Sequence, residues 1–110
     1  MRSTQVIVAG LLALGLIPQT YAASEGYEIV ILNHRFEPAE LTVPAGQKVK
    51  LVVDNRDASP EEFESKELRR EKVIPGHSKA TIWVGPLTSG EYRFFGEFHE
   101  ETAQGKLIVK

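Results

Sequence analysis

The chain contains no cysteine, and it has only one methionine and one tryptophan among its 110 residues. The absence of cysteine excludes a disulfide, and it also excludes a thiolate as a nucleophile or a metal ligand. Any metal ion must therefore be held by oxygen atoms and imidazole nitrogens.

The chain also lacks a run of basic residues. Its net charge at pH 7 is −2, from 13 lysines and arginines against 15 aspartates and glutamates. No segment would follow a phosphate backbone, so nucleic acid is not an expected partner. The hydrophobic fraction of 42% and the charged fraction of 25% are typical of one globular domain.

The one long apolar run lies at residues 6–17, between Arg2 and Pro18, and small residues follow it. This pattern predicts a secretory signal peptide over residues 1–22, cleaved near Ala22 or Ala23, and a periplasmic domain over residues 23–110. The run is shorter than the roughly 20 residues of a membrane-spanning helix. We therefore expect no stable membrane insertion of the mature chain, with an uncleaved anchor as the alternative.

Short runs rich in β-branched and aromatic residues alternate with turn-forming residues through the rest of the chain. The spacing predicts an all-β Greek-key sandwich of seven to eight strands. The expected strands cover residues 27–32, 39–43, 48–55, 61–65, 72–74, 79–84, 91–95 and 105–110. Residues 65–72 are charged nearly all round, which indicates a helical turn or an irregular excursion. Residues 33–38 indicate a bend, because Pro38 disfavours a helix before it.

The closing segment holds a dense group of possible metal ligands. A strand-like run ends near Phe95, a loop with three glutamates and one histidine follows, and a second strand-like run ends the chain. Carboxylate oxygens and imidazole nitrogens suit first-row metal ions. The four residues of this loop are Glu97, His99, Glu100 and Glu101.

This layout resembles the cupredoxins, whose last two strands bracket a loop of ligands. The stretch F-E-P-A-E-L-T-V-P-A-G, residues 36–46, is similar to one in the first half of many cupredoxins. The resemblance extends from about Tyr27 to Lys110. Residues 54–65 and 96–105 look most like the EfeO-type cupredoxin-like domains, which are associated with bacterial iron uptake.

The chain departs from the blue-copper pattern at several positions. Gly96 stands where that pattern has its cysteine, and Glu61, after Pro60, stands where many cupredoxins have a histidine. His99 matches the second histidine, and Gln104 or a neighbour replaces the axial methionine. Without a thiolate, the resemblance does not imply a blue-copper centre.

What remains is an oxygen and nitrogen ligand set drawn from two segments. The predicted metal ligands are Glu61, Glu62, Glu97, His99 and Glu101, with Glu100 as a further source of oxygen or negative potential. Such a set suits iron, Mn(II) or tetragonal Cu(II) rather than Cu(I) or a structural zinc. Two carboxylates about 4 Å apart repel by roughly 4 kcal/mol at an effective dielectric constant of about 20, and a cation would relieve this. The alternative is a solvated acidic edge.

Other polar and aromatic residues have simpler interpretations. We expect His34 at the surface, His77 exposed in a turn, and Glu64 and Glu67 outside the metal site. Trp83 is expected to pack in the core or on a sheet surface. Most of the remaining aromatic residues are expected in the core, except Phe98, which is expected to shield the site from water; these are Phe36, Phe63, Tyr92, Phe94 and Phe98.

Taken together, the residues and the resemblance predict a metal-binding protein of the periplasm that handles iron or copper for an iron-uptake system. Its partners would be the ion and an inner-membrane iron permease or another uptake component. The alternatives are a metal-free interaction module of the envelope and a redox shuttle. We expect no enzyme, because no nucleophile has a histidine and an aspartate near it in sequence and no glycine-rich phosphate loop is present.

Overall fold

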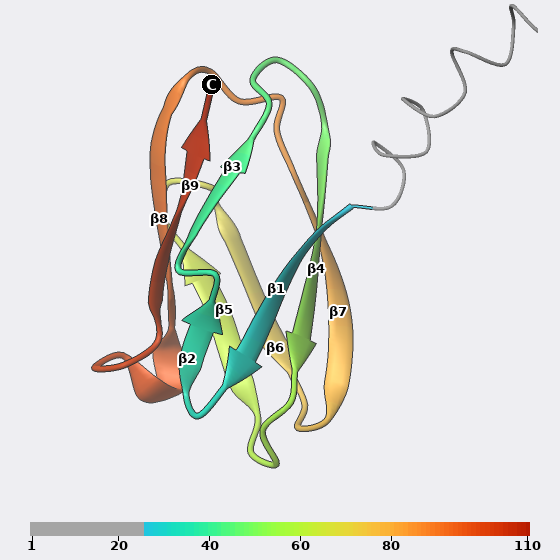
Figure 1. Ribbon diagram of the computed structural model, residues 1–110, viewed down its shortest axis with the longest axis vertical. Coiled ribbons are helices and arrows are strands. Elements are labelled where there is room, and N and C mark those ends of the chain that lie inside the picture. The colour runs from blue at the N-terminus through green and yellow to red at the C-terminus, as the bar shows by residue number, and fades with distance from the viewer. Residues whose placement is uncertain (1–25) are drawn as a thin grey trace, which may run out of the picture.

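The computed structural model describes residues 26–110, and the predicted signal peptide over residues 1–22 lies outside this range. Two β-sheets pack face to face (Figure 1). The first sheet has the order β2 (Arg35–Glu37), β1 (Tyr27–Leu32), β4 (Val49–Asn55) and β7 (Ser78–Val84). The second has the order β3 (Glu40–Val43), β9 (Gln104–Val109), β8 (Gly90–Gly96), β5 (Glu61–Ser65) and β6 (Arg70–Ile74).

The predicted all-β sandwich is confirmed, with nine strands rather than seven or eight. The additional strand is β2, which pairs antiparallel with β1 across a tight turn in the segment expected to be a bend. Residues 65–72, expected to form a helical turn or an irregular excursion, contain a hydrogen-bonded turn at residues 66–69 that joins β5 and β6 in a hairpin. Within residues 26–110, no helix is long and apolar enough to cross a membrane.

The core is formed by every second side chain of each strand, because side chains along a strand point alternately to the interior and to the surface. In β4 the buried residues are Val49, Leu51, Val53 and Asn55, which point between the sheets. The rings of Phe63 and Phe94 stack at 4.9 Å between centroids, and Phe36 packs edge-on against both. In β5 the same alternation places Glu61, Phe63 and Ser65 inside and leaves Glu62 and Glu64 on the outer face. Two adjacent glutamates therefore face opposite sides of one sheet.

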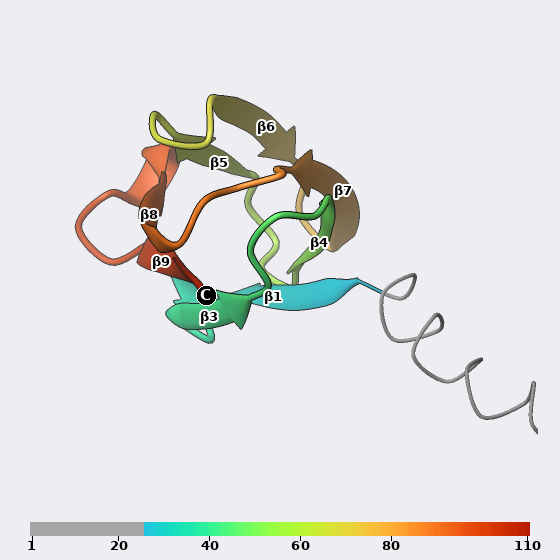
Figure 2. The same ribbon diagram turned by 90° about the horizontal axis from the view of Figure 1, so that it is seen from above.

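Trp83 lies on the outer face of the first sheet and is 45% exposed. The Lys48 ammonium lies 5.2 Å from the centre of its ring. The expected sheet-surface packing of Trp83 is therefore confirmed. The edge strands β6 and β7 lie side by side without pairing (Figure 2), and Arg70 Nε donates to the Trp83 carbonyl oxygen across this opening.

Three of the connections between strands, together with the 3-10 helix, lie at one end of the sandwich. The β1–β2 turn, the β4–β5 loop, the β6–β7 turn and the 3-10 helix η1 (Glu97–His99) all lie at this end (Figure 1). We call it the loop end. It carries all three histidines of the chain, His34, His77 and His99.

Candidate metal site

Glu61 is a buried acidic residue in an otherwise apolar row of side chains. It begins β5 on the inward face, next to Phe63 in the alternation, and is only 1% exposed. Its Oε1 accepts hydrogen bonds from the backbone N–H groups of Glu62 and Phe98, each at 2.9 Å. A buried carboxylate is tolerated only when its charge is paired and its oxygens are hydrogen-bonded.

The partner of that charge is His99. The distance from His99 Nδ1 to Glu61 Oε2 is 2.7 Å, although the two residues are 38 positions apart in sequence. The His99 side chain is 26% exposed and the Glu61 side chain 2%, so the pair joins the interior to the loop end. The structure thus brings together the two residues that the resemblance matches to histidine positions of cupredoxins.

The local structure around His99 explains this geometry. Residues 97–99 form one turn of 3-10 helix, and the His99 carbonyl oxygen accepts hydrogen bonds from the N–H groups of Thr102 and Ala103. Because the segment is a 3-10 turn and not extended, Glu97 and His99 do not face the same way. The turn directs His99 toward Glu61 and places Glu97 with the carboxylates on the outer face of β5.

Gly96 shows why a blue-copper centre does not fit here. A Cβ atom at this position would lie 2.6 Å from Glu61 Cδ, 2.7 Å from Glu61 Oε2 and 2.7 Å from Ala103 Cβ. The Glu61 carboxylate therefore fills the space that a cysteine side chain would enter. Gln104 is exposed, and its amide Nε2 donates to the Glu100 carbonyl oxygen at 2.6 Å; its neighbour Ala103 is buried beside Gly96.

His34 is a component of the site that the sequence did not reveal. It is exposed, as expected, but its ring stacks on the His99 ring with 3.6 Å between centroids and 10° between planes. The Asp57 carboxylate accepts hydrogen bonds from the N–H groups of Asn33 and His34 at 2.8 and 2.9 Å. Partial burial acts to raise the pKa of Asp57, but these hydrogen bonds and the nearby imidazoles of His34 and His99 together lower it. Thr102 Oγ1 donates to the His34 carbonyl oxygen at 2.6 Å.

Asn55 fixes the loop that leads into Glu61. It is fully buried, and its Nδ2 donates to the carbonyl oxygens of Ser59, Ile74 and Pro75. Its Oδ1 accepts from the Asp57 N–H. One side chain thus ties the β4–β5 loop to the end of β6 and holds the start of β5 in place.

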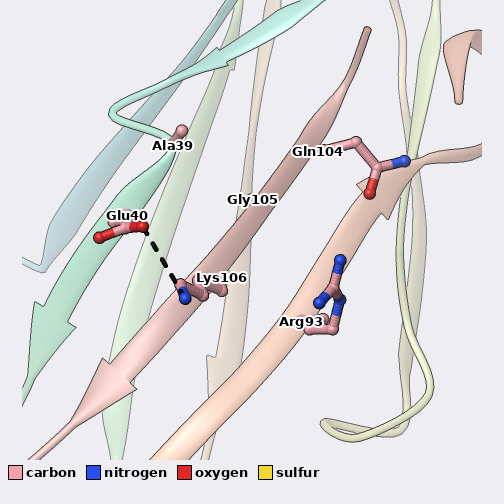
Figure 3. A pocket seen from close by; sticks show the side chains of 6 residues that line it. All are labelled: Ala39, Glu40, Arg93, Gln104, Gly105 and Lys106. Atoms are coloured by element: carbon pink, nitrogen blue, oxygen red, sulfur yellow. Dashed lines mark ion pairs between the residues drawn. The ribbon is translucent and has the colours of Figure 1, made fainter. Parts of the chain in front are cut away.

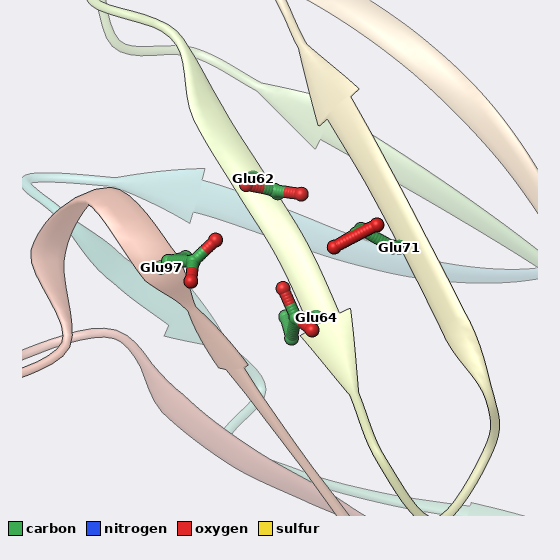
Figure 4. A group of neighbouring side chains, drawn as sticks. All are labelled: Glu62, Glu64, Glu71 and Glu97. Carbon is green, nitrogen blue, oxygen red and sulfur yellow. The ribbon is translucent and has the colours of Figure 1, made fainter.

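Glu62 and Glu97 belong to a different group, on the outer face of the second sheet. Figure 4 shows them with Glu64 and Glu71, and one carboxylate oxygen from each lies within 4.8 Å of the others. A hydrogen bond with Glu97, partial burial and the neighbouring charges raise the pKa of Glu62 to about 7. Partial burial and the charges of Glu71 and Glu97 also raise the pKa of Glu64. We call this group the outer carboxylate cluster.

The outer carboxylate cluster corrects one expectation, because Glu62 and Glu97 lie on the side of β5 away from Glu61. Glu64 lies beside them and so away from the Glu61–His99 pair, as expected. Glu67 lies apart, and its carboxylate accepts a hydrogen bond from the Arg93 N–H. All-oxygen groups of this kind suit hard cations, but exposed acidic groups also occur commonly without an ion.

The remaining predicted residues line a hollow at the loop end. Its volume is about 340 Å³, and its walls are His34, Phe98, His99, Glu100, Glu101 and Thr102. Glu100 and Glu101 are exposed there, and Phe98 is 48% exposed; the shielding expected of its ring stays a prediction. His77 is exposed in the β6–β7 turn, as expected.

A second hollow, of about 210 Å³, lies on the outer face of the second sheet, away from the Glu61–His99 pair (Figure 3). Lys106 crosses it and pairs with Glu91 at 3.0 Å and Glu40 at 3.8 Å. The hydrogen bond and the charge of Glu91 raise the pKa of Lys106. The charged groups of this hollow neutralise one another, so the hollow is a less suitable cation site than the loop end.

Comparisons with known proteins agree with the fold. The family described as "Cupredoxin-like domain" matches residues 5–109. An uncharacterized protein of Rickettsia prowazekii is 44% identical over 82 residues, which cover 74% of this chain and 66% of that protein.

Solved structures with the same fold share little sequence. Auracyanin A, a "blue" copper protein from Chloroflexus aurantiacus, has a TM-score of 0.65 at 19% identity, over 76% of this chain and 96% of its own. Amicyanin from Paracoccus versutus has a TM-score of 0.62 at 17% identity, over 77% of this chain and 81% of its own. A purple cupredoxin from Nitrosopumilus maritimus has a TM-score of 0.60 at 18% identity, over 76% of this chain and 99% of its own.

Proposed function

Because the chain belongs to the family of cupredoxin-like domains, we propose that it is an exported metal-binding protein that holds an iron or copper ion between Glu61 and His99. The observation that carries this proposal is the 2.7 Å approach of Glu61 Oε2 to His99 Nδ1 at the end of the sandwich where the ligand loops of this fold meet. Glu61 Oε2 and His99 Nδ1 are the atoms that would hold the ion.

The chemistry of the pair favours a hard or borderline cation. One carboxylate oxygen and one imidazole nitrogen suit Fe(II), Fe(III) or Cu(II) better than Cu(I), which prefers sulfur. Glu61 is fixed by two backbone N–H groups, so it is already oriented. Such bonds to a ligating carboxylate are typical of metal sites, because they fix the ligand's position. The outer carboxylate cluster adds negative potential nearby, which would raise the local concentration of cations.

The proposed role in the cell follows from the resemblance of residues 54–65 and 96–105 to EfeO-type domains. In this role the protein would take up the ion in the periplasm and pass it to an inner-membrane iron permease or another component of an iron-uptake system. The apolar run at residues 6–17 supports export.

A metal-free interaction module is the second candidate function. The observation in its favour is that every oxygen of the Glu61 carboxylate already has a hydrogen-bond partner in the protein. In that case the Glu61–His99 pair would be a structural substitute for a metal centre, and the acidic surface would contact an envelope partner.

Thermal unfolding of the full chain with Fe(II), under anaerobic conditions, or with Cu(II) separates the two candidates. An ion present at about 100 times its Kd stabilises the folded state by about 2.7 kcal/mol. For a domain of this size, that corresponds to a rise in Tm of roughly 10–20 °C. We expect this rise for the unmodified chain and its loss in Glu61→Gln and in His99→Phe.

The matched controls remove one or two carboxylate charges at other positions. Glu101→Gln, at the exposed wall of the hollow, and the double variant Glu62→Gln/Glu97→Gln, in the outer carboxylate cluster, should keep the full rise. No rise in the unmodified chain would favour the metal-free module. A rise lost only in Glu62→Gln/Glu97→Gln would place the ion on the outer face and overturn the proposed site.

A further inference from the structure

His34 adopts a backbone conformation that a histidine rarely takes. It is the second residue of the two-residue turn between β1 and β2, with φ of 58°, after Asn33 with φ of 55°. Turns of this kind favour glycine at the second position, because a side chain is strained at positive φ. A strained residue that persists beside a candidate site is a reason to look for a function of its side chain.

The surrounding structure holds His34 from two directions. Asp57, in the β4–β5 loop, binds its N–H group, and Thr102, just after η1, donates to its carbonyl oxygen. These are the two segments that also supply Glu61 and His99. Three separate parts of the chain are thus linked by hydrogen bonds around the His34 ring.

The ring nitrogens of the two stacked histidines face one short segment. His99 Nδ1 lies 2.7 Å from Glu61 Oε2, and His34 Nε2 lies 3.4 Å from Ser59 Oγ, two residues before Glu61. The contact with Ser59 is long for a hydrogen bond, so replacing it with a bond from His34 Nε2 to a metal ion would cost little. The His34 ring has to tilt from its stacked orientation for its nitrogen to point at the same ion as His99 Nδ1.

We propose that His34 is the third protein ligand of the ion held by Glu61 and His99, an inference that rests on the function proposed above. The set is then two imidazole nitrogens and one carboxylate oxygen, brought together from the β1–β2 turn, the start of β5 and η1. This set, with further positions left to water or a receiving partner, is typical of divalent first-row ions and of non-haem Fe(II) in particular. It excludes Ca²⁺ and Mg²⁺ as preferred ions, because both prefer oxygen.

The proposal is tested with Cu(II) as the probe, added to the full chain. Isothermal titration gives the Kd, and pulsed electron paramagnetic resonance of the loaded protein counts the coordinated imidazoles. The variants are His34→Gly, which removes the ring and relieves the strained backbone, and His34→Phe, which keeps a stacking ring but has no nitrogen. The matched control is His77→Phe, an exposed histidine at the same end of the sandwich with φ of 53°.

We expect two coordinated imidazoles in the unmodified chain and in His77→Phe, and one in both His34 variants. The Kd should rise about tenfold or more in both His34 variants, while the Tm of metal-free His34→Gly should be no lower than that of the unmodified chain. One imidazole in the unmodified chain, or an unchanged Kd in His34→Phe, would overturn the role of His34 as a ligand. Loss of binding in Glu61→Gln alongside such a result would leave the proposed function intact, whereas unchanged binding in Glu61→Gln would overturn the function itself.

Discussion

Replacing Gly96 with alanine tests whether the Glu61 carboxylate fills the space beside residue 96. The new Cβ would lie 2.6 Å from Glu61 Cδ and 2.7 Å from Ala103 Cβ, far closer than the 3.4 Å or more of ordinary contact. Gly96 has φ of −96° and ψ of 111°, an extended conformation open to alanine, so the expected cost is steric. Overpacking of this kind costs about 1–3 kcal/mol of the free energy of unfolding.

The companion change, Glu61→Ala, removes the carboxylate and leaves the His99 ring and the N–H groups of Glu62 and Phe98 without their acceptor. Its expected cost is about 2–4 kcal/mol. In the double variant the alanine methyl group at position 96 enters the space that the carboxylate left, and only its close approach to Ala103 Cβ remains. The combined loss should therefore be smaller than the sum of the single losses by about 1–2 kcal/mol.

Urea denaturation at equilibrium measures all four free energies of the cycle, provided that the slope of free energy against urea concentration stays constant. Gly96→Ala in a Glu101→Gln background is the control and should show no coupling, because Glu101 lies at the exposed wall of the hollow. Strict additivity of Gly96→Ala and Glu61→Ala, or a Gly96→Ala variant as stable as the parent, would refute the claim that the carboxylate occupies this space.

Two further predictions concern the outer carboxylate cluster and the loop before Glu61. Because the pKa of Glu62 is raised to about 7 from its ordinary 4.5, the folded state holds more protons than the unfolded state between these values, and Glu62 lowers stability as pH rises through that window. Glu62→Gln should therefore become more stable relative to the parent between pH 5 and pH 8 in urea denaturation at low salt, and a constant difference would contradict this. Asn55→Ala should lose about 2–3 kcal/mol, because it removes the buried side-chain hydrogen bonds to the Ile74 carbonyl oxygen and from the Asp57 N–H. It should also shrink the metal-induced rise in Tm, and a variant within about 0.5 kcal/mol of the parent in thermal unfolding would show that Asn55 does not hold this loop.

The strands were predictable because their signals are local. Runs of β-branched and aromatic residues bounded by turn residues predicted eight of the nine strands to within two residues at every end. The β2 strand was missed because three residues next to Pro38 carry too little pattern. It forms because the Asn33–His34 turn, fixed by the distant Asp57 carboxylate, folds it back onto β1.

The separation of Glu61 from Glu62 was also present in the sequence. If Phe63 faces the core, the two-residue period of a strand places Glu61 on the same face and Glu62 and Glu64 on the other. The prediction placed residues 61–65 in a strand but still assigned Glu61 and Glu62 to one set of ligands, which this period does not allow. The part played by His34 could not be predicted in the same way, because it depends on contacts with Asp57, His99 and Thr102, which lie 23 to 68 residues away in the sequence.

The central claim is that an ion binds at Glu61 and His99, and X-ray absorption at the iron edge of the Fe(II)-loaded full chain tests it most directly. Imidazole coordination gives a characteristic scattering from the ring carbons beyond the first shell. We predict this signal in the unmodified chain and its decrease in His99→Phe. First-shell oxygen without any imidazole scattering would contradict the account, because it would place the ion among carboxylates alone, as in the outer carboxylate cluster.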